Sequence, residues 1–283
     1  MKVLISADME GVCGVTSWVQ VMPPELGQEP SSTVEYERAR LRMTREVNAA
    51  IEGAFEAGAD EVIVNDSHDG MRNLIPEELH TEVRFISGSD KELGMMQGLQ
   101  EKVHAAFYVG YHAKAGTPAA PLAHTWTGYV NDVRINGEST GEFGLNALIA
   151  GHFDVPVVLA TGDDKAVAQV KAYVGKQVQG VVVKEGYSTF SAIHLHPTKA
   201  QRLIKEGAKK ALSKLSDAKP KRLSKKSKIE LEFDHQSRAD QCLYIPGIKR
   251  AGERAVSFVA SDALEMNQIF RALIKASRVQ MSP

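Results

Sequence analysis

Short apolar runs alternate along the chain with longer stretches in which apolar residues recur every three or four positions. Five of the runs predict buried strands, at residues 2–7, 61–65, 83–87, 105–109 and 155–161. Helical spacing predicts helices at residues 35–58, 142–153, 197–215 and 263–278. Strands that alternate with helices are typical of βαβ units. We therefore expect an α/β fold with a mainly parallel sheet flanked by helices.

The second half of the chain adds signals of a different kind. Residues 129–135 precede Asn136-Gly137, which suits the positive φ angles of a hairpin turn, and residues 228–233 and 255–259 predict further strands. We expect a first α/β part over residues 1–160 and a C-terminal α/β part over residues 161–283, packed against it. Several prolines within residues 14–34 predict a long loop.

Composition excludes several classes of protein. The 283 residues include 34 basic and 35 acidic side chains, so the net charge of −1 offers no field to attract nucleic acid or an anionic membrane. Two cysteines, Cys13 and Cys242, are too few for a disulfide framework or a four-cysteine zinc module. The first apolar run stops at Asp8, and no run approaches the roughly 18 residues of a spanning helix. We expect a cytoplasmic protein with neither nucleic-acid nor membrane partners.

Potential metal ligands follow three of the predicted strands. Asp8 and Glu10 follow the first, His68 the second and His112 the fourth. In a parallel sheet these strand ends share one edge, where ligands of α/β proteins bind. Asp8 and Glu10 are two positions apart and point the same way, so they repel unless a cation, a proton or an arginine lies between them. The pattern indicates a metal site; a strand-end turn with Asp8 as a helix cap is the alternative.

The roles of three further residues can each be interpreted in two ways. Asp66 either accepts the second N–H of the His68 ring, as carboxylates beside metal ligands do, or caps the segment that follows. Glu142 opens a predicted helix, where the helix dipole alone favours an acidic residue. His124 lies among small and apolar residues and is either packed or catalytic.

Other reactive side chains lack supporting neighbours. His194 and His196 are spaced like a metal pair, but no carboxylate lies beside them, so we interpret them as structural. Cys13 lies close to Asp8 in sequence without an identifiable base, and we interpret it as a small packed residue.

Five motifs occur in a characteristic order: Asp8-Met9-Glu10-Gly11, Asn65-Asp66-Ser67-His68, Gly110-Tyr111-His112-Ala113, the isolated His124, and Gly141-Glu142-Phe143-Gly144-Leu145-Asn146-Ala147. Each motif is short, but together and in this order they are specific. They resemble the D-aminopeptidase family of dizinc metallopeptidases (the DppA type), and the resemblance runs over nearly the whole chain.

The resemblance implies a zinc-dependent aminopeptidase that removes residues from the free N-terminus of short peptides, with a preference for D-amino acids. It implies two zinc ions per chain, with Asp8 as the bridge. The matching ligands are Asp8, Glu10, His68, His112 and Glu142. His124 matches the family's catalytic histidine, which is often described as a nucleophile. If a metal-activated water is the nucleophile instead, the role of His124 is proton transfer or stabilisation of the oxyanion.

The family also assembles as a homodecamer with active sites that face an inner chamber, so the resemblance implies a homo-oligomer. Three other functions stay open: a dinuclear-metal amidase, an L-aminopeptidase of the same family, and a non-catalytic metal- or peptide-binding protein. Oxygen-rich sites with two histidines also accept manganese, cobalt or iron, so zinc rests on the resemblance alone.

Overall fold

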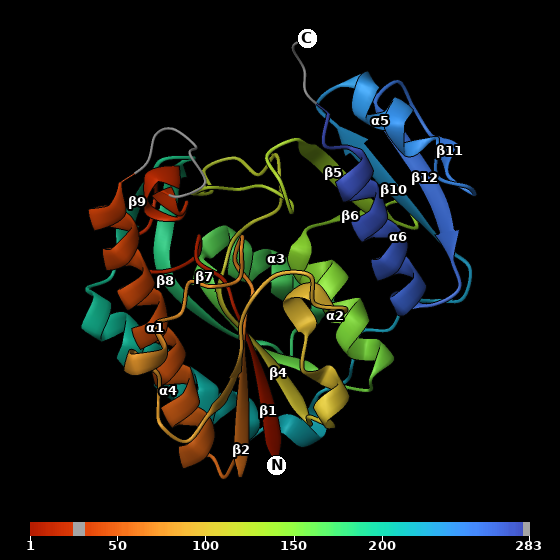
Figure 1. Ribbon diagram of the computed structural model, residues 1–283. Coiled ribbons are helices and arrows are strands. Elements are labelled where there is room, and N and C mark those ends of the chain that lie inside the picture. Colours follow the sequence, from red (N-terminus) through yellow and green to blue (C-terminus); the bar gives the residue numbers. More distant parts are fainter. Residues whose placement is uncertain (25–31, 280–283) are drawn as a thin grey trace.

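Two sheets form the framework of the protein in the computed structural model, which describes residues 1–24 and 32–279 (Figure 1). The larger sheet has seven strands in the order β3-β2-β1-β4-β7-β8-β9, and the smaller has five in the order β11-β12-β10-β5-β6. Helices flank the larger sheet, which confirms the predicted α/β class with a mainly parallel sheet. Residues 25–31 of the predicted 14–34 loop lie outside the described residues.

The larger sheet consists of β1 (Lys2–Ala7), β2 (Glu61–Asp66), β3 (Arg84–Ile86), β4 (Ala105–Tyr111), β7 (Val157–Asp163), β8 (Gln179–Ser188) and β9 (Ser191–His194). Every pairing is parallel except that of β9 with β8. β4 and β7 are buried along their whole length, and β1 and β2 along all but one residue. Burial on both faces explains why these strands are continuous apolar runs in the sequence.

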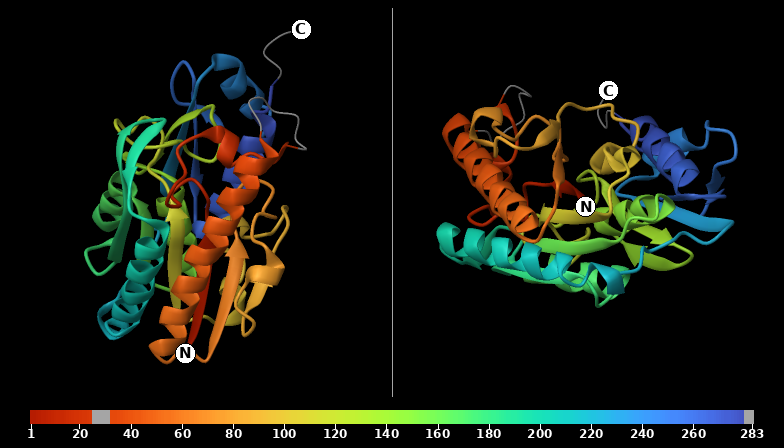
Figure 2. Two further views of the ribbon diagram at one scale, coloured as in Figure 1. Left: turned by 90° about the vertical axis from the view of Figure 1, so that its left-hand side faces the viewer. Right: turned by 90° about the horizontal axis from the view of Figure 1, so that it is seen from below.

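Helices cover both faces of this sheet. α1 (Thr33–Glu56) and α4 (Pro197–Leu212) share one apolar core with it, and α2 (Glu142–His152) and α3 (Asp164–Val174) contribute to the core on the other face (Figure 2). Ser32 caps α1 by accepting the N–H of Glu35. Short 3₁₀ turns lie at Trp18–Gln20, Pro76–Glu78, Gly94–Met96, Leu99–Glu101 and Leu215–Asp217.

The smaller sheet is antiparallel and comprises β5 (Val130–Ile135), β6 (Glu138–Thr140), β10 (Ser227–Phe233), β11 (Lys249–Arg250) and β12 (Ala255–Ala260). α5 (Gln236–Cys242) and α6 (Ala263–Ala276) pack against it, and its apolar core is continuous with that around α2. The predicted hairpin is confirmed: Asn136 and Gly137 both adopt positive φ angles between β5 and β6. The helix predicted from residue 263 is also confirmed as α6, and Asp262 caps it by accepting the N–H groups of Leu264 and Glu265.

The predicted division at residue 160 falls inside β7, and both sheets use strands from either side of it. β5 and β6 come before residue 160 but belong to the smaller sheet, in which β5 pairs with the C-terminal strand β10. The two sheets therefore do not correspond to residues 1–160 and 161–283. That division of the chain stays a prediction. Over the described residues, no helix combines the length and the apolar character needed to cross a membrane.

Candidate metal centre

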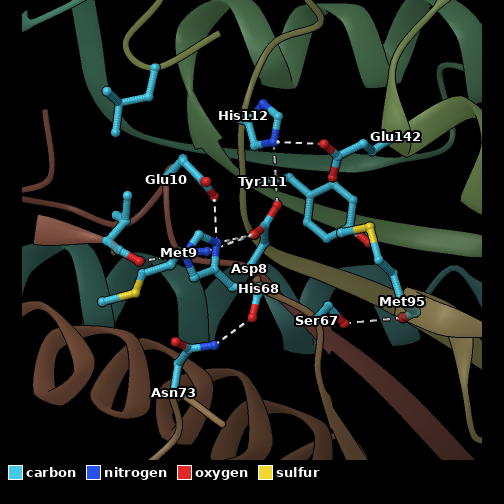
Figure 3. A network of polar contacts seen from close by, with 12 residues as sticks. Asp8, Met9, Glu10, Ser67, His68, Asn73, Met95, Tyr111, His112 and Glu142 are labelled. Carbon is cyan, nitrogen blue, oxygen red and sulfur yellow. Dashed lines mark hydrogen bonds and ion pairs between the residues drawn. The ribbon is translucent and has the colours of Figure 1, made fainter. Parts of the chain in front are cut away.

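The predicted ligands converge at the carboxyl edge of three adjacent strands. Asp8 follows β1, His68 follows β2 and His112 follows β4, and β1 lies between the other two strands. Glu10 lies two residues beyond Asp8, and Glu142 is the first residue of α2 (Figure 3). All five side chains are buried, each at most 6% exposed. The strand ends thus bring together residues that are up to 134 positions apart in the sequence.

Two glycines let the turn that carries Asp8 and Glu10 lie directly against β4. A Cβ atom on Gly11 would lie 2.0 Å from the carbonyl oxygen of Tyr111, and one on Gly110 would lie 2.2 Å from that of Asp8. Gly110 also has a φ angle of +73°. The N–H of Gly11 donates to the carbonyl of Gly110 at 2.7 Å. The glycines in the two motifs therefore hold the ligand turn against its neighbouring strand.

The ligand atoms form two groups that share Asp8. Oδ1 of Asp8 lies 3.4 Å from Nδ1 of His68, which in turn is 3.1 Å from Oε2 of Glu10. Oδ2 of Asp8 lies 3.6 Å from Nε2 of His112, which is 3.3 Å from Oε1 of Glu142. Neighbouring ligands about 2.0–2.1 Å from a tetrahedral zinc ion would be about 3.3 Å apart. Each group thus has the spacing of a metal site, and Asp8 presents one oxygen to each.

Two oxygen atoms in this centre lack a hydrogen-bond partner. Among the described residues, Oδ2 of Asp8 and Oε2 of Glu10 are fully buried and accept no hydrogen bond. Leaving a buried polar atom unpaired costs about 1–3 kcal/mol, and more when it is charged. A cation between the carboxylates would compensate this cost. The orphaned oxygens and the oxygen–imidazole donor set both fit a pair of divalent metal ions.

Backbone carbonyls fix the two histidine rings in orientations suited to metal binding. Nε2 of His68 donates to the carbonyl of Val21 at 2.7 Å, and Nδ1 of His112 donates to that of Ala113 at 2.9 Å. A carbonyl oxygen only accepts, so each bonded ring nitrogen carries the proton in the neutral ring. In the neutral ring the other nitrogen carries the lone pair, and this nitrogen faces the carboxylates.

Asp66 does not orient His68, and the capping alternative for Asp66 is confirmed. Its carboxylate accepts the backbone N–H groups of Asn73 and Leu74 and the side-chain amide of Asn73. The amide of Asn73 also donates to the carbonyl of His68. Asp66 therefore fixes the loop that carries the ligand, while Val21, distant in sequence, fixes the ring.

Burial and charge repulsion raise the pKa of one carboxylate in the centre, and the nearby imidazoles lower the pKa of the others. Burial, reinforced by the Glu10 carboxylate, raises the pKa of Asp8 to about 8. Burial also opposes the charge of Glu10, but the imidazoles of His68, His112 and His124 together hold the pKa of Glu10 well below its usual value. Burial opposes the charge of His112 too, yet Glu142 and the other carboxylates raise its pKa to about 10. The three carboxylates can thus ionise together only beside positive charge.

His124 lies beside the two groups that share Asp8 and forms a third group of ligand spacing with Glu10 and His112. Its Nε2 is 3.8 Å from Oε1 of Glu10 and 3.7 Å from Oε1 of Glu142, and its ring stacks on His112 with centroids 4.1 Å apart. Nδ1 donates to the carbonyl of Leu122 at 2.9 Å, so the neutral ring presents the Nε2 lone pair to the centre. Burial, with the nearby His112, lowers the pKa of His124.

A cavity of about 1070 Å³ opens above the ligands and His124. Its walls include the apolar side chains Trp18, Val21, Met22, Met71, Met95 and Trp126. Ligand pockets for small molecules usually enclose about 300–1,000 Å³. The cavity has room for a short peptide beside the metal centre, with apolar surface for small side chains.

Comparison with known proteins agrees with this geometry. The family described as D-aminopeptidase matches residues 1–272. The chain belongs to the D-aminopeptidase family. It is 37% identical to the D-aminopeptidase of Bacillus subtilis (strain 168) over 269 residues, which cover 95% of this chain and 94% of that protein.

A solved member of the D-aminopeptidase family has the same fold. It is described as the Zn-dependent D-aminopeptidase DppA from Bacillus subtilis, a self-compartmentalizing protease. The TM-score is 0.93 at 35% sequence identity, and the match covers 100% of both chains. The resemblance stated from the five motifs is thereby confirmed.

Sequence reasoning missed a buried lysine behind the centre of this D-aminopeptidase family member. Lys184 in β8 is 1% exposed, and its ammonium donates to the backbone carbonyls of Glu10, Val12 and Val15 at 2.5, 3.1 and 2.6 Å. Burial lowers the pKa of Lys184 to about 8. The lysine thus fixes the segment that carries Glu10. Its one sequence signal is a charged residue directly after three valines.

The residues interpreted as structural have structural partners. His194 accepts the N–H of Gly14, and His196 caps α4 by accepting the N–H of Thr198. The thiol of Cys13 donates to the carbonyl of Leu195, and burial raises the pKa of this thiol to about 11. Cys13 is therefore a protonated, packed residue at neutral pH, as predicted.

Proposed function

We propose that this member of the D-aminopeptidase family is a zinc-dependent aminopeptidase that hydrolyses short peptides from the free N-terminus, with a preference for D-amino acids. The observation that carries the proposal is the pair of ligand groups that share Asp8 at the floor of a peptide-sized cavity. The names of the relatives, a D-aminopeptidase and a Zn-dependent D-aminopeptidase, support the metal and the substrate class.

Two zinc ions per chain would be held by Asp8, Glu10, His68, His112 and Glu142, with Asp8 in both groups. When bound, zinc supplies a Lewis acid that polarises a scissile carbonyl and lowers the pKa of a water from 15.7 to about 7. The protein holds the side chains of the proposed ligands in fixed orientations. Glu142, for example, accepts the N–H of Trp126 at 2.6 Å through the oxygen that faces His112.

His124 is the catalytic residue in this proposal. Because Nδ1 is engaged by the Leu122 carbonyl, Nε2 is the nitrogen that can take up or deliver a proton at the reacting group. Once protonated, the same nitrogen can donate to a developing oxyanion. Since the metal centre supplies the means to activate water, we favour these roles over direct nucleophilic attack by His124.

The assembly follows from the relatives less directly than the activity does. The solved relative is described as self-compartmentalizing, which supports a homo-oligomer, and we propose a decamer with access for short peptides. The cytoplasmic location stays a prediction. An amidase or L-aminopeptidase built on the same centre is the alternative, since the ligand groups alone do not set the stereochemistry of the substrate.

Hydrolysis of matched dipeptides tests the proposed function. We expect the purified, zinc-loaded protein to cleave D-Ala-D-Ala faster than L-Ala-L-Ala, and to lose both activities when a chelator removes the metal and regain them when zinc is restored. p-Nitrophenyl phosphate serves as the control substrate for phosphoesterase activity. Faster cleavage of the L-peptide would support the L-aminopeptidase alternative, and chelator-resistant hydrolysis would exclude a metal mechanism.

A further inference from the structure

The cavity above the metal centre has two walls of opposite charge. The acidic wall belongs to the larger sheet and its loops, and the basic wall to the C-terminal α5 and α6 region. The acidic residues that line it are Asp8, Glu10, Asp69 and Glu142. Within residues 1–24 and 32–279, its lining lysines and arginines are Arg238 and Arg278 alone. A peptide with a free amine and a free carboxylate matches this distribution of charge.

We propose that Arg238 and Arg278 form a subsite for the C-terminal carboxylate of the short peptide substrate, an inference that rests on the proposed function. The amine end of the peptide would then lie toward the carboxylate-rich metal centre. The two arginines select peptides whose carboxyl terminus is free and lies within reach of that centre.

Arg238 is held rigidly in the cavity wall. Its Nε donates to Oδ1 of Asp234 at 2.6 Å, and its guanidinium lies over the ring of Tyr129, 4.0 Å from the ring centre. Its Nη1 donates to the carbonyl of Ser277 at 2.9 Å. The residue is only 8% exposed. Because its position is already fixed, little side-chain entropy would be lost when it binds a ligand.

The remaining nitrogen of Arg238 is available. Nη2 has no hydrogen-bond acceptor among the described residues, although a guanidinium carries five N–H donors. Arg278 is exposed, and its side chain likewise has no hydrogen bond or ion pair with a described residue. Arg238 bonds the carbonyl of Ser277, the residue directly before Arg278, and both arginines line the same cavity.

A short stretch of chain connects the metal centre to the cavity wall that holds Arg238. Trp126 donates its N–H to the ligand Glu142, and Tyr129, which lies under Arg238, is three residues further along. Three residues span at most about 11 Å of extended chain. Extended peptides of two to four residues span about 7–14 Å on the same scale. Arg238, Arg278 and the metal ligands all line the same cavity, so we infer that a short peptide in it can contact both the arginines and the metal centre.

The charge balance leaves the pair able to bind an anion. Asp234 compensates one positive charge, but its side chain is 44% exposed and largely solvated. Arg278 adds a second, uncompensated charge. Hydrogen bonds from arginine to a carboxylate are about twice as strong as neutral ones, and the partly enclosed cavity reduces the competition from water.

The test compares D-Ala-D-Ala with its C-terminal amide on the zinc-loaded enzyme. We expect the wild type to favour the free acid by about 10-fold or more in kcat/KM, the scale of one hydrogen bond to a charged group. Arg278→Gln and Arg238→Gln should lower that acid-to-amide ratio toward 1, mainly through KM of the acid. Arg202→Gln, an exposed arginine of α4 that does not line the cavity, is the matched control.

The ratio separates a binding role from a structural one, since a folding defect lowers both rates together. Arg278→Gln covers the case in which the buried Arg238→Gln fails to fold. Equal wild-type rates on acid and amide, or an unchanged ratio in Arg278→Gln, would overturn the carboxylate subsite while the aminopeptidase function stands. Failure of the wild type to cleave either peptide would overturn the proposed function and the subsite with it.

Discussion

Asp8→Ala should remove both zinc ions from the protein and abolish peptide hydrolysis. Its two carboxylate oxygens face different histidines, His68 and His112, at 3.4 and 3.6 Å, so a single substitution takes a ligand from each group. Each group would retain only one carboxylate and one imidazole. The zinc content of the purified variant, measured by elemental analysis, should fall from two ions per chain toward none. We expect kcat to fall with it.

Asp69→Asn is the matched control for this loss. Asp69 is a carboxylate that lines the same cavity and follows His68 directly, but it belongs to neither ligand group. Its φ angle of 45° suits asparagine, which tolerates the left-handed region. We expect this variant to bind two zinc ions. If Asp8→Ala also bound two per chain, Asp8 could not be the bridge.

His124→Ala should keep both zinc ions and lose about 10²-fold or more in kcat. The ring lies 3.7 Å or more from Glu10 and Glu142 and is outside the two groups that share Asp8, so its loss leaves all five proposed ligands in place. A positioned acid or base typically contributes 10²–10⁴-fold. Steady-state kinetics and elemental analysis of the same preparation measure the two effects together.

His152→Ala, at an exposed histidine at the end of α2, should retain wild-type kinetics and serves as the control. Normal turnover by a fully metallated His124→Ala enzyme would exclude His124 from the chemistry. A covalent intermediate trapped on His124 in the wild type would instead favour the nucleophile over proton transfer.

The arrangement of the metal centre could be predicted because it depends on local signals and one general rule. Asp8, His68 and His112 each follow an apolar run, and the carboxyl ends of parallel strands share an edge. The acidic first turn of α2 had an equally good explanation in the helix dipole. The family resemblance was needed to choose Glu142 and His124.

The partners behind the ligands could not be predicted, because they are contacts between distant segments. The ring of His68 is oriented by a backbone carbonyl, that of Val21, which any residue type provides. Lys184 reaches Glu10 from 174 positions away, and one charge after a run of valines does not specify where its ammonium points. The second sheet pairs β5 with β10, two strands about a hundred residues apart in the sequence. The periodicity within a strand does not specify which other strand it pairs with.

The central claim is that two zinc ions share Asp8. Diffraction from crystals of the wild-type protein at wavelengths on either side of the zinc absorption edge tests it most directly. We predict two anomalous peaks about 3.5–4 Å apart, the separation usual for two-metal sites. One should lie among Asp8, Glu10 and His68, and the other among Asp8, His112 and Glu142. A single peak, or peaks away from these side chains, would contradict the account.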